Sequence, residues 1–293
     1  MGYDEVVRLP DERLLGYLDG GDPRGIPIIF CHGSPSSRLA VVDLLGEASE
    51  RGARVIAPDR PGLGRSEADP GRSLASWAAD VAALADALGL ARFRLLAVSG
   101  GGPYALATAW ALPHRVERVA LLSSPGSFDI PGATDGMARA HRLTWLLARW
   151  QPRLLGVLLR QQLRAAQRDP ARFSARLVEA MHGEDAAALM ALAPDWRRRF
   201  VADPFIEALA RDPGAGAGDL RILRAPWGFG VQDVRVPVHL WHGEADDATP
   251  RQMGGWLAAM LPDVEAHFLA GEGHTSTILR YQAAALDALV SGG

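Results

Sequence analysis

The chain has 293 residues, 48% of them hydrophobic, and a formal net charge of -3, which suits one large domain with a substantial core. The slightly acidic charge argues against nucleic acid as a partner, because phosphate binding needs a basic face. The single cysteine, Cys31, excludes an internal disulfide. With charged residues near the start and no apolar run of membrane-spanning length, we expect a cytoplasmic protein without a membrane partner.

In the first half of the chain, short apolar runs alternate with helical patterns. Residues 5–9 and 13–19 are typical of an opening hairpin. The runs that predict buried strands are residues 26–31, 53–57, 93–98 and 116–122, and the helical patterns between them are residues 39–51, 74–88 and 103–112. This alternation predicts an α/β fold with a doubly wound, mostly parallel sheet.

The second half begins with a helical block. Between residues 130 and 230 we find helical patterns at 145–159, 172–182 and 205–211, interrupted by a Gly-rich stretch at 212–218. Strand–helix alternation returns with a run at 236–241, a last strand ending at Leu269 and a closing helix at 276–290. We therefore expect a core formed by residues 1–127 and 232–293, with a helical cap inserted at 128–231.

The segment from Phe93 to Leu106, FRLLAVSGGGPYAL, is the sharpest motif. A strand pattern leads into Ser99, three glycines and a helix, so the turn must be tight, with a strained, exposed serine and small neighbours at Ala97 and Gly101. The alternative is a glycine-rich turn with an ordinary solvated serine. A phosphate-binding loop is disfavoured, because the segment lacks Gly-Lys-Ser/Thr and Gly-x-Gly-x-x-Gly.

A second segment, IIFCHGSP at residues 28–35, ends another predicted strand. The backbone N–H groups of Ser34 and Gly100 are candidate donors to an oxyanion that forms at Ser99. His32 is interpreted as shaping this loop by hydrogen bonding rather than moving a proton, and it is also a candidate for lining a substrate pocket.

Three motifs together resemble the α/β-hydrolase fold superfamily, and more narrowly its bacterial members with a helical cap. They are His32-Gly33, the run DRPGLGRS at residues 59–66, and SGGGPY at residues 99–104. The first glycine of the superfamily's G-x-S-x-G pattern is Ala97 here, which is a mild departure because alanine is also small. The DRPGLGRS run is assigned a supporting role, turned by Gly62 and Gly64.

The resemblance implies a catalytic triad in the order serine, acid, histidine. The family's acid lies three residues after the glycine of the His-Gly turn at residues 242–243, which selects Asp246, with Glu244 and Asp247 as rivals. Its base follows the last strand, which selects His274 among eight histidines. The triad implies an acyl-enzyme mechanism on a small-molecule substrate, with no metal or organic cofactor.

The cap carries several aromatic residues, and we expect most of them to pack it against the core. Trp227 and Phe229 are the preferred candidates for lining an apolar pocket, because they directly precede the return to the core. The arginine run at residues 197–199 is interpreted as a solvated helix face. Together these features favour a carboxylic ester, or a related acyl compound, of small to medium size.

Other functions share the same triad, and the sequence leaves them open. They are C–C bond hydrolase, acyltransferase, aminopeptidase and perhydrolase activity, besides a non-catalytic ligand-binding role on the same scaffold. Haloalkane dehalogenases and epoxide hydrolases are disfavoured, because they place Asp where this chain has Ser99. The sequence gives no prediction of the oligomeric state.

Overall fold

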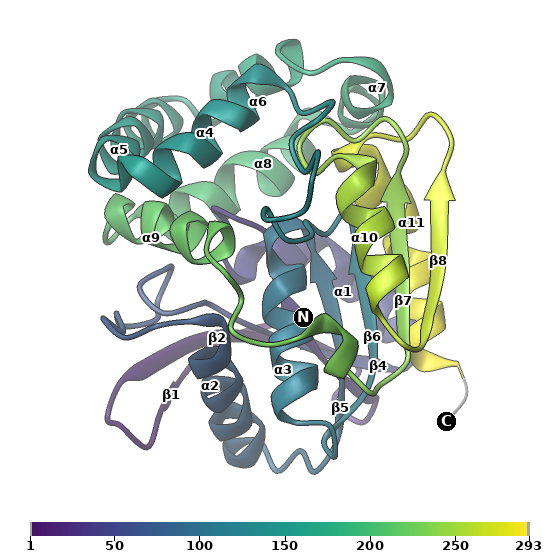
Figure 1. Cartoon of the computed structure of the whole chain (residues 1–293). Coiled ribbons are helices and arrows are strands. Elements are labelled where there is room, and N and C mark those ends of the chain that lie inside the picture. The colour runs from purple at the N-terminus through teal and green to yellow at the C-terminus, as the bar shows by residue number, and fades with distance from the viewer. Residues whose placement is uncertain (1, 292–293) are drawn as a thin grey trace.

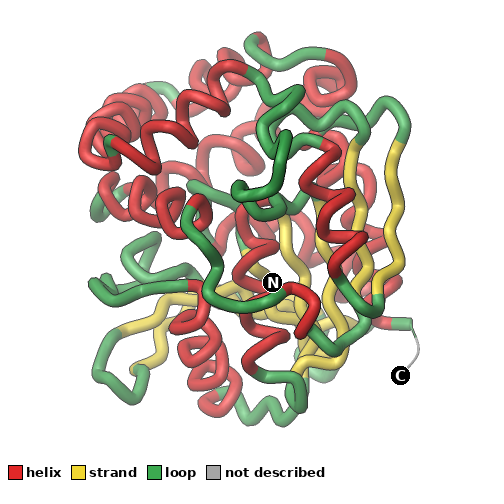
Figure 2. Tube along the Cα trace, in the orientation of Figure 1, coloured by secondary structure: helices red, strands yellow, loops and turns green. Residues whose placement is uncertain are grey.

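The computed structural model describes residues 2–291 and has an eight-stranded sheet at its centre (Figures 1 and 2). The strand order is β1-β2-β4-β3-β5-β6-β7-β8, in which β1 and β2 are antiparallel to their neighbours and the other pairs are parallel. The strands are β1 (Tyr3–Arg8), β2 (Leu14–Gly21), β3 (Ile26–Cys31), β4 (Ala53–Pro58), β5 (Phe93–Val98), β6 (Val116–Leu122), β7 (Val238–Gly243) and β8 (Val264–Leu269).

Helices cover both faces of this sheet, because the side chains of a strand alternate between its faces. Ile29 packs in one buried cluster with residues of α2, α3 and α10, while Ile28 and Phe30 pack with residues of α1 and α11 on the other face. The core helices are η1 (Arg38–Leu44), α1 (Leu45–Glu50), α2 (Leu74–Ala87), α3 (Gly102–Ala111), α10 (Arg251–Met260) and α11 (His274–Val290). The expected doubly wound α/β fold is confirmed.

A helical region is inserted between β6 and β7 and lies over the carboxyl ends of the parallel strands (Figure 1). Its helices are α4 (Arg139–Trp150), α5 (Pro152–Arg168), α6 (Pro170–Glu179), α7 (Gly183–Ala191), α8 (Pro194–Leu209) and α9 (Pro213–Arg224). A short turn, η3 (Val231–Asp233), leads back to the core. None of the helices within residues 2–291 combines the length and apolar composition needed to cross a membrane.

Two helix predictions in the cap were wrong in detail. The pattern at 145–159 is divided between α4 and α5, because Pro152 disfavours helical backbone at Gln151 and instead starts α5. The Gly-rich stretch at 212–218 belongs to α9, where Asp212 caps the helix and Pro213 begins it. A Cβ atom on Gly216 would collide with Leu209, so glycine here permits close helix packing.

Candidate active site

The turn after β5 holds Ser99 in a left-handed backbone conformation with a φ of 49°. Such a conformation is strained for a residue with a side chain and persists only where its surroundings enforce it. Here the turn packs tightly against the loops after β3 and β6. A Cβ atom on Gly101 would overlap the Cys31 carbonyl, and one on Gly102 would overlap the Ser124 side chain. The glycines therefore allow the close approach that fixes Ser99.

Ser99, His274 and Asp246 come together in one hydrogen-bonded chain. The Ser99 Oγ lies 2.9 Å from His274 Nε2, and His274 Nδ1 lies 2.9 Å from Asp246 Oδ2. His274 is the first residue of α11, at the end of the loop that follows β8. The strand ends thus bring together three residues that are far apart in the sequence, and the hydrogen-bonded imidazole can accept a proton from the hydroxyl.

Asp246 is the acid that contacts His274 among the three that the sequence offers. Its Oδ1 accepts hydrogen bonds from the backbone N–H groups of Ala248 and Thr249, and the Thr249 hydroxyl donates to its Oδ2. Glu244 is exposed and lies near Arg251 instead. The buried Asp246 carboxylate is therefore held in one orientation toward the imidazole.

The charges of this pair shift the pKa of each partner. Burial alone would raise the pKa of Asp246, but the attraction of His274 and the hydrogen bonds to the carboxylate outweigh it and lower the pKa. Burial alone would lower the pKa of His274, but the attraction and hydrogen bond of Asp246 outweigh it and raise the pKa. Asp246 is thus ionised, and it stabilises the protonated imidazole.

The loop after β3 lies directly against Ser99. A Cβ atom on Gly33 would stand 3.5 Å from the Ser99 Cβ, and one on Gly100 would meet the Ser34 side chain. Ser34 and Gly100 are therefore neighbours beside the candidate nucleophile. That their amides bind an oxyanion stays a prediction.

A buried ion pair fixes this loop. The Arg60 guanidinium contacts both oxygens of Asp219, at 2.9 and 2.8 Å, and also donates to the Gly33 carbonyl and the Ser34 hydroxyl. The Ser34 hydroxyl and the Tyr104 hydroxyl donate to Asp219 in turn. Burial alone would raise the pKa of Asp219, but Arg60 holds the pKa well below its usual range. Because Asp219 lies on α9, this network joins the cap to the loop beside Ser99.

The structure corrects the expectation that His32 lines a pocket. Its ring is fully buried away from the cavity at Ser99. Its Nδ1 lies beside the Gly33 carbonyl, and its Nε2 accepts a hydrogen bond from the backbone N–H of Arg60. Burial, and then the charge of Arg60, lower the pKa of His32 to about 3, so the ring is neutral. Instead, His32 shapes the loop by hydrogen bonding, in line with the interpretation of this residue from the sequence.

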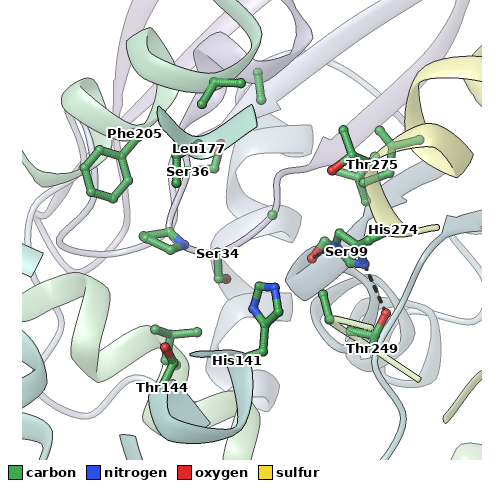
Figure 3. Close-up of a pocket in the computed structure, with 18 of the residues that line it drawn as sticks. Ser34, Ser36, Ser99, His141, Thr144, Leu177, Phe205, Thr249, His274 and Thr275 are labelled. Carbon is green, nitrogen blue, oxygen red and sulfur yellow. Dashed lines mark hydrogen bonds between the residues drawn. The ribbon is translucent and has the colours of Figure 1, made fainter. Parts of the chain in front are cut away.

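A cavity of about 600 Å³ lies between the cap and the sheet, with Ser99 and His274 in its wall. Its polar lining includes His141, Thr144 and Gln162 from the cap, and Figure 3 shows the His141 ring pointing into the cavity. The remaining lining is mostly apolar and includes Leu147, Leu155, Leu159, Phe173, Phe200 and Phe205. Such a cavity suits a mainly apolar small molecule with few polar groups.

Trp227 and Phe229 were wrongly expected in this pocket. Neither lines the cavity at Ser99. Trp227 packs edge-on against Trp256, and Phe229 stacks on Trp110 with 5.5 Å between ring centroids. Both residues follow α9, the last cap helix, in the segment that leads back to β7. They pack this segment against core helices α3 and α10 rather than under the cap.

Sequence reasoning missed Asp185, which lies in the first turn of cap helix α7. Its carboxylate accepts hydrogen bonds from the backbone N–H groups of His274, at 3.0 Å, and Ser276, at 2.8 Å. It therefore caps the N-terminus of α11, where a negative charge is favourable. The residues lie 89 apart in sequence, and the only local hint was an acid in the first turn of a helix.

The fold and this arrangement of residues define an α/β hydrolase. The chain belongs to the alpha/beta hydrolase fold family, whose model matches residues 26–281. Within residues 2–291, no group of three or more His, Cys, Asp or Glu side chains is placed to hold a metal ion.

Individual relatives have different activities. The chain is 31% identical to a pimeloyl-[acyl-carrier protein] methyl ester esterase from Aromatoleum aromaticum, over 72% of this chain and 76% of that protein. It is 39% identical to a 2-hydroxy-6-oxo-2,4-heptadienoate hydrolase from Pseudomonas putida, but this match spans only 39% of the chain and 42% of the relative. An alpha/beta hydrolase fold protein from Nakamurella multipartita has a similar structure, with a TM-score of 0.71 and 22% identity over 99% of this chain and 100% of that one.

Proposed function

We propose that this hydrolase cleaves a carboxylic ester of a small to medium apolar substrate, with Ser99 as nucleophile. The observation that carries the proposal is the hydrogen-bonded chain of Ser99, His274 and Asp246 in the wall of a mainly apolar cavity. The esterase named among the relatives supports an ester as substrate. The apolar lining supports an acyl or aryl group in the cavity.

The proposed reaction has two halves. His274 Nε2 takes the proton of the Ser99 hydroxyl as the Oγ attacks the ester carbonyl, and Asp246 stabilises the imidazolium. The backbone N–H groups of Ser34 and Gly100 donate to the oxyanion, each contributing about 3 kcal/mol to transition-state stabilisation. The protonated His274 then gives its proton to the leaving alkoxide. Water, activated by the same imidazole, releases the acid from Ser99.

A C–C bond hydrolase is the second candidate, and the heptadienoate hydrolase among the relatives favours it. The cavity adds a physical reason, because the cap contributes the polar side chains of His141, Thr144 and Gln162 to a mostly apolar lining. A substrate with a second oxygen function, such as a keto or enol group, would use them.

The test is hydrolysis of p-nitrophenyl esters of increasing acyl length by the wild-type protein and Ser99→Ala. Both proteins are also treated with a fluorophosphonate probe, and the labelled peptide is identified by mass spectrometry. We expect ester turnover and labelling at Ser99, both lost in Ser99→Ala. Labelling at Ser99 without ester turnover would favour the C–C hydrolase, to be tested with a 2-hydroxy-6-oxo-dienoate. A folded protein with neither signal would refute both.

A further inference from the structure

The first two cap helices, α4 and α5, form a strongly basic segment, which we term the cationic hairpin (residues 139–168). It contains no Asp or Glu, and all seven of its arginines are exposed: Arg139, Arg142, Arg149, Arg153, Arg160, Arg164 and Arg168. Within the part of the chain that the structure describes, no carboxylate forms a salt bridge with any of them. By contrast, Arg198 and Arg199 on α8 pair with Asp203 and Asp43.

Large apolar side chains lie exposed among these arginines. Leu146 and Trp150 on α4 are 50% and 66% exposed, and Leu154 and Val157 on α5 are 48% and 51% exposed. Their spacing of four and three residues places each pair on one helix face. The Arg149 guanidinium lies 4.7 Å from the centre of the Trp150 ring. Cationic and apolar groups therefore share the outer surface of the hairpin.

We propose that the cationic hairpin docks on a lipid bilayer that contains anionic lipids. Arginines without carboxylate partners fit phosphate headgroups, and the exposed apolar side chains fit the boundary between headgroups and acyl chains. The net charge of the whole chain is -3, so this positive surface is a local feature and not a general property. The described residues include no membrane-spanning helix, which is compatible with docking, because a helix that lies on a membrane does not cross it. The proposal therefore departs from the expectation of no membrane partner, which rested on the lack of a spanning segment.

The position of the hairpin supports a lipid partner. Figure 1 shows α5 at the outer edge of the cap and α4 across its front, with both helices above the sheet. The same two helices contribute Leu147, Leu155 and Leu158 to the lining of the cavity at Ser99. The docking face therefore adjoins the cavity wall. An acidic protein would also complement the arginines, but the exposed Trp150 and aliphatic side chains favour a lipid surface.

The test is sedimentation with phosphatidylcholine vesicles, prepared with and without phosphatidylglycerol as the minor lipid. The wild-type protein should sediment with the anionic vesicles and be released by salt. Arg160→Glu/Arg164→Glu should weaken binding at least tenfold, because each basic residue near an anionic surface contributes about fivefold. Trp150→Ser should also weaken it, by removing an apolar contact. The matched control is Arg24→Glu/Arg235→Glu, which makes the same change in charge where the chain enters β3 and β7, away from the cap.

The outcomes are distinct from those of the esterase test, because binding does not require turnover. Wild-type binding with loss in the hairpin variants alone would support the proposal. No sedimentation with either vesicle would overturn it, as would equal loss in the control variant. Hairpin-dependent binding to soluble polyglutamate, without vesicle binding, would assign the surface to an acidic protein and also overturn the lipid proposal.

Discussion

Replacement of Asp185 should affect both stability and the behaviour of His274, although Asp185 is not in contact with the imidazole. Asp185→Ala removes a buried acceptor of two backbone N–H groups at the start of α11. Each charge-assisted bond contributes about 1.5 kcal/mol at the low end of its range, so we expect about 3 kcal/mol lower unfolding free energy. Asp185→Asn should lose about half of this, because its amide keeps one acceptor oxygen.

The same change should move the pH profile in a defined direction. Burial lowers the pKa of His274, whereas the charge of Asp246 and, to a smaller extent, that of Asp185 raise it. The imidazole must be neutral to accept the Ser99 proton, so activity falls as pH drops through this pKa. Both variants should therefore shift the acidic limb of kcat/KM to lower pH. We also expect a roughly tenfold lower kcat from the displaced imidazole in Asp185→Ala.

The assay combines ester hydrolysis across pH with thermal unfolding. Asp195→Asn is the matched control, because Asp195 is an exposed acid at the start of α8 that forms no salt bridge in the described residues. A lower unfolding temperature in Asp185→Ala, with kcat and the acidic limb unchanged, would refute the positioning role and leave only a structural one.

Further substitutions test the triad acid, the buried network and the cavity. In steady-state ester hydrolysis, Asp246→Asn should lower kcat by about 10³–10⁴-fold, while the kcat of Asp247→Asn should stay within about threefold of the wild-type value. Equal effects of the two substitutions would contradict the assignment of Asp246 as the acid. Asp219→Asn should lower the unfolding free energy by about 3–5 kcal/mol in denaturant titration, because it leaves a buried guanidinium without its counter-charge. Leu147→Trp, which narrows the cavity, should shift preference to shorter acyl chains in the p-nitrophenyl series, while Trp227→Leu leaves it unchanged. A change of chain preference in the Trp227 variant alone would contradict the placement of the cavity.

The sequence predicted those features that depend on local pattern. Apolar runs identified the strands, and small residues around Ser99 identified the tight turn after β5. Both the burial of a strand and the steric demands of a tight turn constrain residues that are neighbours in sequence, so a local pattern shows them. Trp227 and Phe229 were misassigned because an aromatic side chain can pack against core or line a cavity, and only the path of the cap decides between them. Asp185 was missed for a similar reason, since its partners lie on a helix that is distant in sequence.

Two buried acids of the cap contact the two sides of the site. Asp219 on α9 binds the loop that carries Ser34, and Asp185 on α7 binds the helix that carries His274. The cap is therefore not an exchangeable module, since a transplanted cap without these carboxylates would leave a buried arginine and two backbone amides unpaired. Substrate range in such a protein is expected to change through cap positions other than these two acids, such as Leu147, Phe173 and Phe205, which line the cavity.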